Sequence, residues 1–295
     1  MATDCPDCGG SELTDEFIAP AFDPPRESLP DSYQLARCQR CQLVFTAGVE
    51  EKLLEKVYSA DYYGSGKQKF NRVIERILAF GAKRRARSIT KRWRAESTSN
   101  PAVLDIGCGR GLLLRAFRDA GATVHGFERS LEPVERSLQD AVYVGSLDDL
   151  HAATCKYDVA VIWHVLEHIA APDDVLGSLG GLLQHNALLV ITVPNFNSLQ
   201  RRIFGRHWFH LDLPRHVVHF EAKVLSKKLI TAGYKVEAIS FFEPAQSVYG
   251  FIQSTMNTLF PRSKNRFYTL LKLSGLSSLF HGFELVLWSV LAAVL

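Results

Sequence analysis

The sequence lacks the features that direct a chain into a membrane, to export or to nucleic acid. Its most apolar stretch, from Gly282 to Leu295, has 14 residues; as a helix it would span about 21 Å, short of a hydrocarbon core of about 30 Å. No charged leader with an apolar run and a cleavage site opens the sequence, so we expect a cytoplasmic protein. The formal net charge of +3 is too small to indicate a nucleic-acid partner.

Cysteine is scarce, with six residues among 295, and four of them form two Cys-x-x-Cys pairs. In a reducing compartment such cysteines are metal ligands or free thiols more often than disulfides. Four thiolates suit tetrahedral Zn²⁺ with no open position for catalysis, so we expect a structural zinc ion; free thiols and disulfides are the alternatives. Cys108 and Cys155 have no partner at metal-ligand spacing and are interpreted as buried small residues. The expected zinc ligands are Cys5, Cys8, Cys38 and Cys41.

The chain divides into four segments of different character. Residues 1–50 carry the cysteine pairs and are expected to form a zinc-ribbon-like domain. Residues 51–100 contain a basic stretch with helical spacing and are expected to form a helical linker or lid. A cofactor-binding domain is expected over 101–245, followed by an apolar helical region over 246–295. That last region could lie on a membrane surface, dock on a partner or pack on its own core.

Apolar strands and helical stretches alternate from residue 102 onward. Parallel strands need crossover connections, so this order predicts an α/β fold with a doubly wound, mostly parallel sheet and helices on both faces. We find no internal repeat and no low-complexity segment. The expected strands are 102–106, 123–128, 141–145, 157–163, 187–194 and 234–242, and the expected helices are 111–120, 131–139, a short helix near Asp148, 172–184 and 222–232.

A glycine-rich loop follows the first of these strands in the stretch DIGCGRG, which starts at Asp105. Glycine lets the backbone turn sharply and approach a ligand closely, and the next helix offers free N–H groups. The spacing differs from the G-x-G-x-x-G fingerprint of dinucleotide-binding proteins. Glu128 ends the next strand, where a carboxylate can accept hydrogen bonds from both ribose hydroxyls. These residues predict a nucleoside ligand, with NAD as the second choice.

Residues 102–242, with VLDIGCGRG, GFE, YDVAVIWHVLEHI and LLVITVPN in order, resemble the class I S-adenosylmethionine-dependent methyltransferases. The resemblance implies a Rossmann-like sheet and S-adenosylmethionine as cofactor. Methyltransferases of sugar and glycan pathways that resemble this chain often carry an N-terminal zinc ribbon. A packed strand-end histidine is an equal alternative for His164. The resemblance implies a site with Asp105, Gly107 and Gly109 at the methionine end, Glu128 at the ribose, Ser146 and Leu147 at the adenine edge, and Trp163 and His164 facing the methyl group.

The stretch HWFHLDLPRHVVHF, from His207 to Phe220, holds four histidines after the fifth strand. Ligands bind at the carboxyl ends of strands in such folds, and a histidine can remove a proton from a methyl acceptor. A metal site is disfavoured because Pro214 breaks the helix that would align the histidines. A purely structural role is the alternative for each histidine, and His207 and His210 are interpreted in that way. The expected catalytic residues are His216 or His219 as general base, with Asp212 and Arg215 as positioning or anion-binding partners.

These features favour a methyltransferase that acts on a small molecule, a glycan or a lipid-linked intermediate, with O-methylation preferred because a histidine base suits it. Contact with an anionic membrane surface is a further expectation from the basic helix and the apolar C-terminal region. Two other functions stay open: a non-catalytic scaffold built on the zinc ribbon, and an RNA methyltransferase. Nucleic acid is disfavoured because neither the fourth strand end, WHVLEH, nor the fifth, VPN, resembles the loops that grip a flipped base. The sequence does not indicate an oligomeric state.

Overall fold

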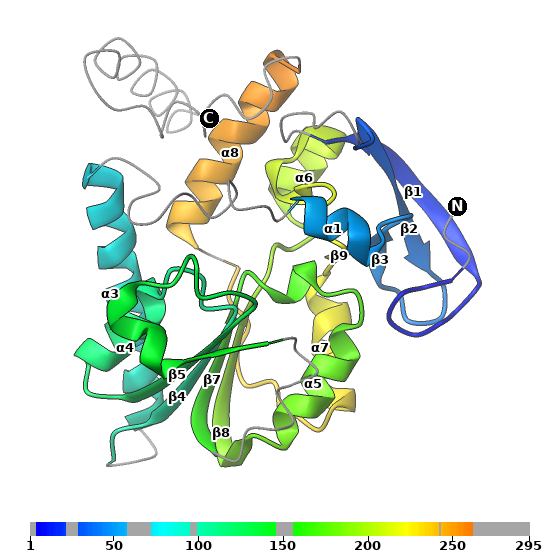
Figure 1. Cartoon of the computed structure of the whole chain (residues 1–295). Coiled ribbons are helices and arrows are strands. Elements are labelled where there is room, and N and C mark those ends of the chain that lie inside the picture. The colour runs from blue at the N-terminus through cyan, green and yellow to red at the C-terminus, as the bar shows by residue number, and fades with distance from the viewer. Residues whose placement is uncertain are drawn as a thin grey trace. The chain divides into compact units, whose positions relative to one another are not determined.

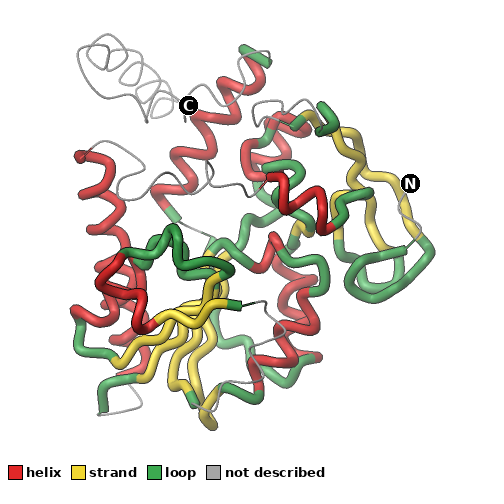
Figure 2. Tube along the Cα trace, viewed as in Figure 1, coloured by secondary structure: helices red, strands yellow, loops and turns green. Residues whose placement is uncertain are grey.

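The computed structural model describes residues 4–21, 29–57, 72–94, 99–145, 156–241 and 243–261. The chain divides into two compact units, and both are discontinuous in sequence. Unit 1 comprises residues 1–58, 167–170 and 194–295, and unit 2 comprises residues 59–166 and 171–193. Residues 194–245, expected in the cofactor-binding domain, therefore group with the N-terminal segment. Figures 1 and 2 show the elements of each unit.

Unit 2 is built on a five-stranded sheet in which every neighbouring pair is parallel. The strands are apolar and the central ones are buried on both faces, as parallel sheets require. The expected α/β fold with a parallel sheet is confirmed. In spatial order the strands are β6 (Val142–Val144), β5 (Thr123–Glu128), β4 (Ala102–Ile106), β7 (Tyr157–Trp163) and β8 (Leu183–Thr192).

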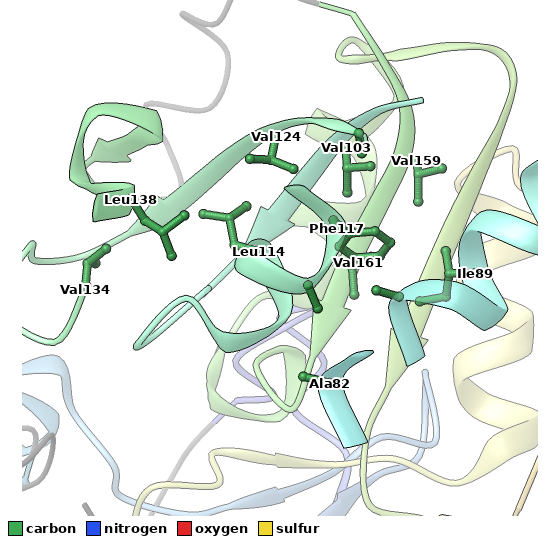
Figure 3. Packing of buried hydrophobic residues seen from close by; sticks show 13 residues of the cluster. Ala82, Ile89, Val103, Leu114, Phe117, Val124, Val134, Leu138, Val159 and Val161 are labelled. Carbon is green, nitrogen blue, oxygen red and sulfur yellow. The ribbon is translucent and has the colours of Figure 1, made fainter. Parts of the chain in front are cut away.

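Helices cover both faces of this sheet (Figure 1). Helices α3 (Arg72–Arg94) and α4 (Leu112–Asp119) pack side by side on one face, and α5 (Pro172–Gly180) lies on the other. Figure 3 shows Ala82 and Ile89 of α3 near Phe117 of α4, in a cluster with valines of the strands. Phe117 is fully buried. A basic helix was expected within residues 51–100, and the structure places it at Arg72–Arg94, where its apolar side packs into the core of unit 2.

Unit 1 contains a four-stranded antiparallel sheet in the order β1 (Leu13–Pro20), β2 (Ser32–Cys38), β3 (Val44–Thr46) and β9 (Val218–His219). Strand β9 belongs to the histidine stretch, and Val44 pairs with His219. A separate core holds this unit together around Leu35, Val44 and Trp208. Among the described residues of unit 1, the α-helices are α1 (Glu51–Val57), α6 (Leu199–Phe204), α7 (Ala222–Thr231) and α8 (Pro244–Leu259), with 3-10 turns at Gly205–His207 and Phe209–Leu211.

Two expected elements are wrong. Residues 131–139 do not form an α-helix; bends over 131–134 lead into a 3-10 helix, η1 (Arg136–Ala141). Residues 234–241 alternate as a strand would, but they pair with no described strand, and Phe241 is exposed. A strand requires a hydrogen-bonding neighbour, which the alternation alone does not supply.

Several expectations fall on residues outside the described ranges. They are Ser146, Leu147, the helix near Asp148, Cys155 and the apolar stretch 282–295. Within the described ranges, no helix combines the length and the apolar character needed to cross a membrane.

Candidate active site

The loop after β4 is shaped by glycines at alternate positions. Gly107, Gly109 and Gly111 all have positive φ, a backbone conformation that residues with a side chain rarely adopt. A Cβ on Gly107 would lie 2.4 Å from the Val165 Cγ2 atom, so no other residue fits there without displacement. A Cβ on Gly109 would meet no atom within 4 Å. The loop therefore leaves open space above Gly109, where a ligand can approach the backbone.

Glu128, at the end of β5, is tied to this loop. One carboxylate oxygen, Oε2, accepts a hydrogen bond of 2.7 Å from the Gly109 amide, and Oε1 accepts one of 2.9 Å from the Arg129 amide. The residue is 7% exposed. Its carboxylate is thereby held beside the glycine loop, which is the position from which it can bind ribose hydroxyls.

Asp105 is buried in β4 next to this carboxylate. Burial, and then the charge of Glu128, raise the pKa of Asp105 to about 7. Burial disfavours the charged form of the Asp105 carboxyl group, and the negative charge of Glu128 repels a second carboxylate, so both effects raise the pKa. Near neutral pH the site can therefore hold or release a proton at Asp105.

A cavity of about 190 Å³ opens beside these residues in unit 2. The guanidinium of Arg85 from α3 lies 4.7 Å from the centre of the Trp163 ring, in the geometry of a cation–π contact. The cavity thus combines a buried acid, a cation and an aromatic face. Its lining includes Arg85, Asp105, Gly107, Cys108, Arg110 and Trp163.

The strand end after β7 is also near its expected role. Trp163 lines the cavity. His164 has a φ of 54° and donates its amide hydrogen to the Thr192 carbonyl at 2.9 Å. Asp105, Gly107 and Trp163 thus lie around one cavity. The hydrogen bond between Gly109 and Glu128 attaches Glu128 to the glycine loop that lines this cavity.

An ion pair that the sequence did not suggest ties α3 to the glycine loop. Arg110 donates two hydrogen bonds to the Glu75 carboxylate, of 2.9 and 3.1 Å. Glu75 is the acidic residue in the first turn of an otherwise basic helix. That isolated charge is the signal that could have identified it.

In unit 1, His216 has both ring nitrogens in defined surroundings. Its Nδ1 lies 2.8 Å from the His210 carbonyl oxygen, so Nδ1 carries a hydrogen and donates it. Its Nε2 lies 3.9 Å from Glu167 Oε1 and 3.8 Å from Asp212 Oδ2. The residue is 7% exposed. A neutral ring therefore directs the lone pair of Nε2 toward two carboxylates.

His219 lies in β9 and faces Thr46 of β3. The Thr46 hydroxyl donates to the His216 carbonyl at 2.7 Å, so it accepts from His219 Nε2, which lies 3.0 Å away. Burial, and then the neighbouring His216, lower the pKa of His219 to about 3. His219 is consequently a neutral ring at physiological pH, with its Nε2 hydrogen engaged.

Asp212 and Arg215 pair with each other. Arg215 Nε donates to Asp212 Oδ2 at 2.9 Å, and Arg215 Nη2 donates to Oδ1. Burial would raise the pKa of Asp212, but the guanidinium outweighs it and holds the pKa well below its usual range. The peptide between Leu213 and Pro214 in this turn is cis. Asp212 therefore pairs with Arg215 and also lies 3.8 Å from His216 Nε2.

Glu167 and His168 join this group, although neither was among the expected catalytic residues. His168 Nδ1 donates to the Arg215 carbonyl at 2.9 Å, and its ring centre lies 4.7 Å from that of His216. Burial, and then His216, lower the pKa of His168 to about 4. Glu167 is 2% exposed. Their position four and five residues after Trp163 was the available signal.

The remaining two histidines of the stretch, His207 and His210, lie next to helix α8. His210 presents its carbonyl to His216, and its Nε2 would lie 2.3 Å from a Cβ placed on Gly250 of α8. The His207 carbonyl accepts a hydrogen bond of 3.4 Å from Asn257. Whether His216 or His219 acts as a base stays a prediction at this point.

The four cysteines of the two pairs converge in unit 1. Their sulfur atoms all lie within 4.8 Å of one another, with Cys5 and Cys41 at 3.7 Å and Cys8 and Cys38 at 3.5 Å. Four thiolates around Zn²⁺ at about 2.3 Å would have sulfur atoms about 3.8 Å apart. The observed separations fit such a tetrahedron.

Known proteins share parts of this architecture. A family model described as a methyltransferase domain matches residues 69–239. Ubiquinone biosynthesis O-methyltransferases from Haemophilus ducreyi and Actinobacillus pleuropneumoniae are 31% and 29% identical over 144 and 143 residues, or 44% and 43% of this chain. The match spans 61% of each relative. The solved magnesium protoporphyrin IX methyltransferase from Synechocystis is 17% identical over 65% of this chain and 92% of its own, with a TM-score of 0.48.

Proposed function

Because the chain belongs to the methyltransferase-domain family, we propose that it transfers a methyl group from S-adenosylmethionine to a hydroxyl group. The observation that carries this proposal is the Glu128 carboxylate held on the Gly109 amide beside an open glycine loop. When bound, the cofactor supplies an electrophilic methyl group on a sulfonium.

The residues around the cavity divide the binding of this cofactor among them. Glu128 accepts hydrogen bonds from the ribose hydroxyls, and Asp105 faces the ammonium group at the methionine end. Gly107 and Gly109 allow the methionine portion to approach the backbone. Trp163 and His164 lie toward the methyl group, and Ser146 and Leu147 bound the adenine. Support for this division comes from the cavity, which Asp105, Gly107 and Trp163 line together.

The acceptor is a hydroxyl of a small molecule, glycan or lipid-linked intermediate. Relatives at about 30% identity are named O-methyltransferases of ubiquinone biosynthesis, which favours oxygen as the methylated atom. The apolar sequence from Gly282 to Leu295 favours a lipid-linked acceptor at the cytoplasmic face of a membrane.

His216 is the general base in this proposal. Its Nε2 carries the lone pair because Nδ1 donates to the His210 carbonyl. Glu167 and Asp212, each within 4 Å of Nε2, stabilise the imidazolium that forms when the acceptor proton is taken up. His219 has its Nε2 hydrogen engaged by Thr46, so it orders the backbone around His216. The Asp212–Arg215 pair positions the turn that carries His216.

The zinc ion belongs to the cysteine cluster and is structural. Four thiolates complete its coordination, which leaves no site for a substrate. The ion would join Cys5 and Cys8, near the start of the chain, to Cys38 at the end of β2 and to Cys41. It would supply the cross-link that a sheet of short strands otherwise lacks.

Calorimetry with S-adenosylhomocysteine tests the cofactor site, and release of S-adenosylhomocysteine with a panel of phenols, catechols and nucleotide sugars tests the transfer. We expect His216→Gln to reduce turnover about 100-fold while cofactor affinity is unchanged, since a general base contributes about 10²–10⁴-fold. His207→Gln is the matched control and should retain turnover. Equal effects of the two substitutions would return His216 to a packing role, and absence of cofactor binding by the wild type would overturn the proposed function.

A further inference from the structure

Glu167, His168 and His216 form a second group of ligand atoms apart from the cysteines. One ligand atom from each residue lies within 4.8 Å of the other two. Glu167 is 2% exposed and His216 is 7% exposed. A carboxylate so deeply buried needs positive charge or hydrogen-bond donors nearby, because an isolated buried charge is strongly unfavourable. The group is therefore electrostatically suited to a cation.

The backbone fixes the tautomer of both histidines. His168 Nδ1 lies 2.9 Å from the Arg215 carbonyl and His216 Nδ1 lies 2.8 Å from the His210 carbonyl. A carbonyl only accepts, so each Nδ1 carries a hydrogen, and the lone pair of each neutral ring is on Nε2. Metal-binding histidines commonly donate their second N–H in this way, which orients the ring and raises its ligand strength.

Two imidazole nitrogens and one carboxylate are a ligand set that divalent transition metals accept. The His216 Nε2 to Glu167 Oε1 distance is 3.9 Å. Ligand atoms at about 2.1 Å from a tetrahedral Zn²⁺ are about 3.4 Å apart, so the two side chains need to approach by about half an ångström. Rotation of the Glu167 carboxylate alone can provide that shift.

We propose that Glu167, His168 and His216 bind a divalent transition-metal cation such as Zn²⁺ or Co²⁺. The cation is coordinated by Nε2 of His216, which then cannot accept a proton. The inference rests on the proposed function for its consequence: a cation on Nε2 removes the lone pair that the general base needs, so turnover falls as the site fills. The site is chemically distinct from the cysteine cluster, which offers sulfur alone.

Titration with Co²⁺ of protein that holds a single equivalent of zinc, the one in the cysteine cluster, tests the second site by visible absorption. We expect one equivalent to bind without the near-ultraviolet sulfur-to-cobalt charge-transfer bands that cobalt in the cysteine cluster would produce. His168→Gln should weaken this binding by at least about 100-fold, because it removes a ligand rather than an outer contact. His207→Gln is the control and should bind Co²⁺ as the wild type does. Thermal unfolding of each variant shows whether the fold is retained.

The outcomes separate this proposal from the proposed function. Absent Co²⁺ binding, or equal binding by the His168→Gln and His207→Gln variants, overturns the metal site, while S-adenosylhomocysteine binding in the same samples keeps the methyltransferase proposal intact. Co²⁺ binding together with higher turnover overturns the competition at Nε2. Co²⁺ binding that lowers turnover in the wild type, and has little effect in His168→Gln, supports both parts.

Discussion

The Glu128 carboxylate accepts a 2.7 Å hydrogen bond from the amide of Gly109, and so joins the end of β5 to the loop after β4. These two points lie next to each other in the sheet because β4 and β5 are parallel neighbours, with Ile106 opposite Phe127. The carboxylate is thus oriented before any ligand arrives. Preorganisation of this kind lowers the entropic cost of binding.

Glu128→Ala should weaken S-adenosylhomocysteine binding by about 10- to 100-fold. A hydrogen bond to a charged group contributes about 1.5–3 kcal/mol, and each 1.4 kcal/mol is a tenfold change in affinity. Isothermal titration calorimetry measures this directly. Glu132→Ala, at an exposed position four residues further along, should leave the affinity unchanged. Undiminished binding by Glu128→Ala would remove Glu128 from the cofactor site.

Alanine at Gly107 should destabilise the protein more than alanine at Gly109. Both residues have positive φ, so each substitution carries a backbone cost of about 1–2 kcal/mol. Only Gly107→Ala also overlaps Val165, which adds about 1–3 kcal/mol. Urea unfolding of the two variants isolates the contribution of the overlap. Equal losses would mean that Val165 moves aside without cost.

Cofactor affinity should rise with pH up to about 7 and then level off. The folded protein holds the Asp105 proton with a pKa of about 7, against an ordinary aspartate value of 3.8. This proton must leave before the carboxylate can pair with the cofactor's ammonium group. One linked proton corresponds to about a tenfold gain in affinity per pH unit below 7. Without ligand, the same shift makes the protein lose stability as the pH rises from about 4 to about 7.

Asp105→Asn should remove this pH dependence, and Asp140→Asn, at an exposed position, should preserve it. Calorimetry with S-adenosylhomocysteine between pH 5.5 and 8, about the range in which Asp105 titrates, provides the comparison. A slope that survives in Asp105→Asn would assign the proton to another group.

Local sequence patterns predicted the strands on either side of the glycine loop. Strands β4 and β5 begin and end where expected, because Asn100-Pro101, the glycines and Glu128 mark their ends within the sequence itself. Glu128 and Gly109 could be paired in advance because adjacent parallel strands end at the same sheet edge.

The histidine side depends on contacts that no local pattern encodes. Val44 pairs with His219 across most of the chain, and Glu167 meets His216 from a different segment. The disfavoured metal interpretation considered only histidines within one stretch, and Pro214 does prevent their alignment on a helix. An argument from the spacing within one stretch cannot detect ligands that tertiary folding brings together from different segments.

Removal of zinc should lower the thermal stability of the protein. Cys38 is fully buried, and its sulfur lies 3.5 Å from that of Cys8. Cys38→Ser should therefore release the bound zinc ion. It should also lower the unfolding temperature by several degrees, because each 1 kcal/mol of lost stability shifts that temperature by about 2–4 °C. Metal analysis by mass spectrometry and a thermal scan test both effects. Cys108→Ser, a buried thiol outside the cluster, should retain the zinc ion. Zinc retained by Cys38→Ser would contradict the four-thiolate site.

The Thr46 hydroxyl joins the N-terminal sheet to the histidine stretch, and its loss should be costly. The residue is 3% exposed; its hydroxyl donates to the His216 carbonyl and accepts from His219 Nε2. Thr46→Val keeps the volume but leaves a buried N–H and a buried carbonyl without this partner, which costs about 1–3 kcal/mol. Thr46→Ser keeps the hydroxyl and should lose much less in urea unfolding. Because the same hydroxyl fixes the backbone of His216, Thr46→Val should also lower turnover while S-adenosylhomocysteine affinity stays unchanged.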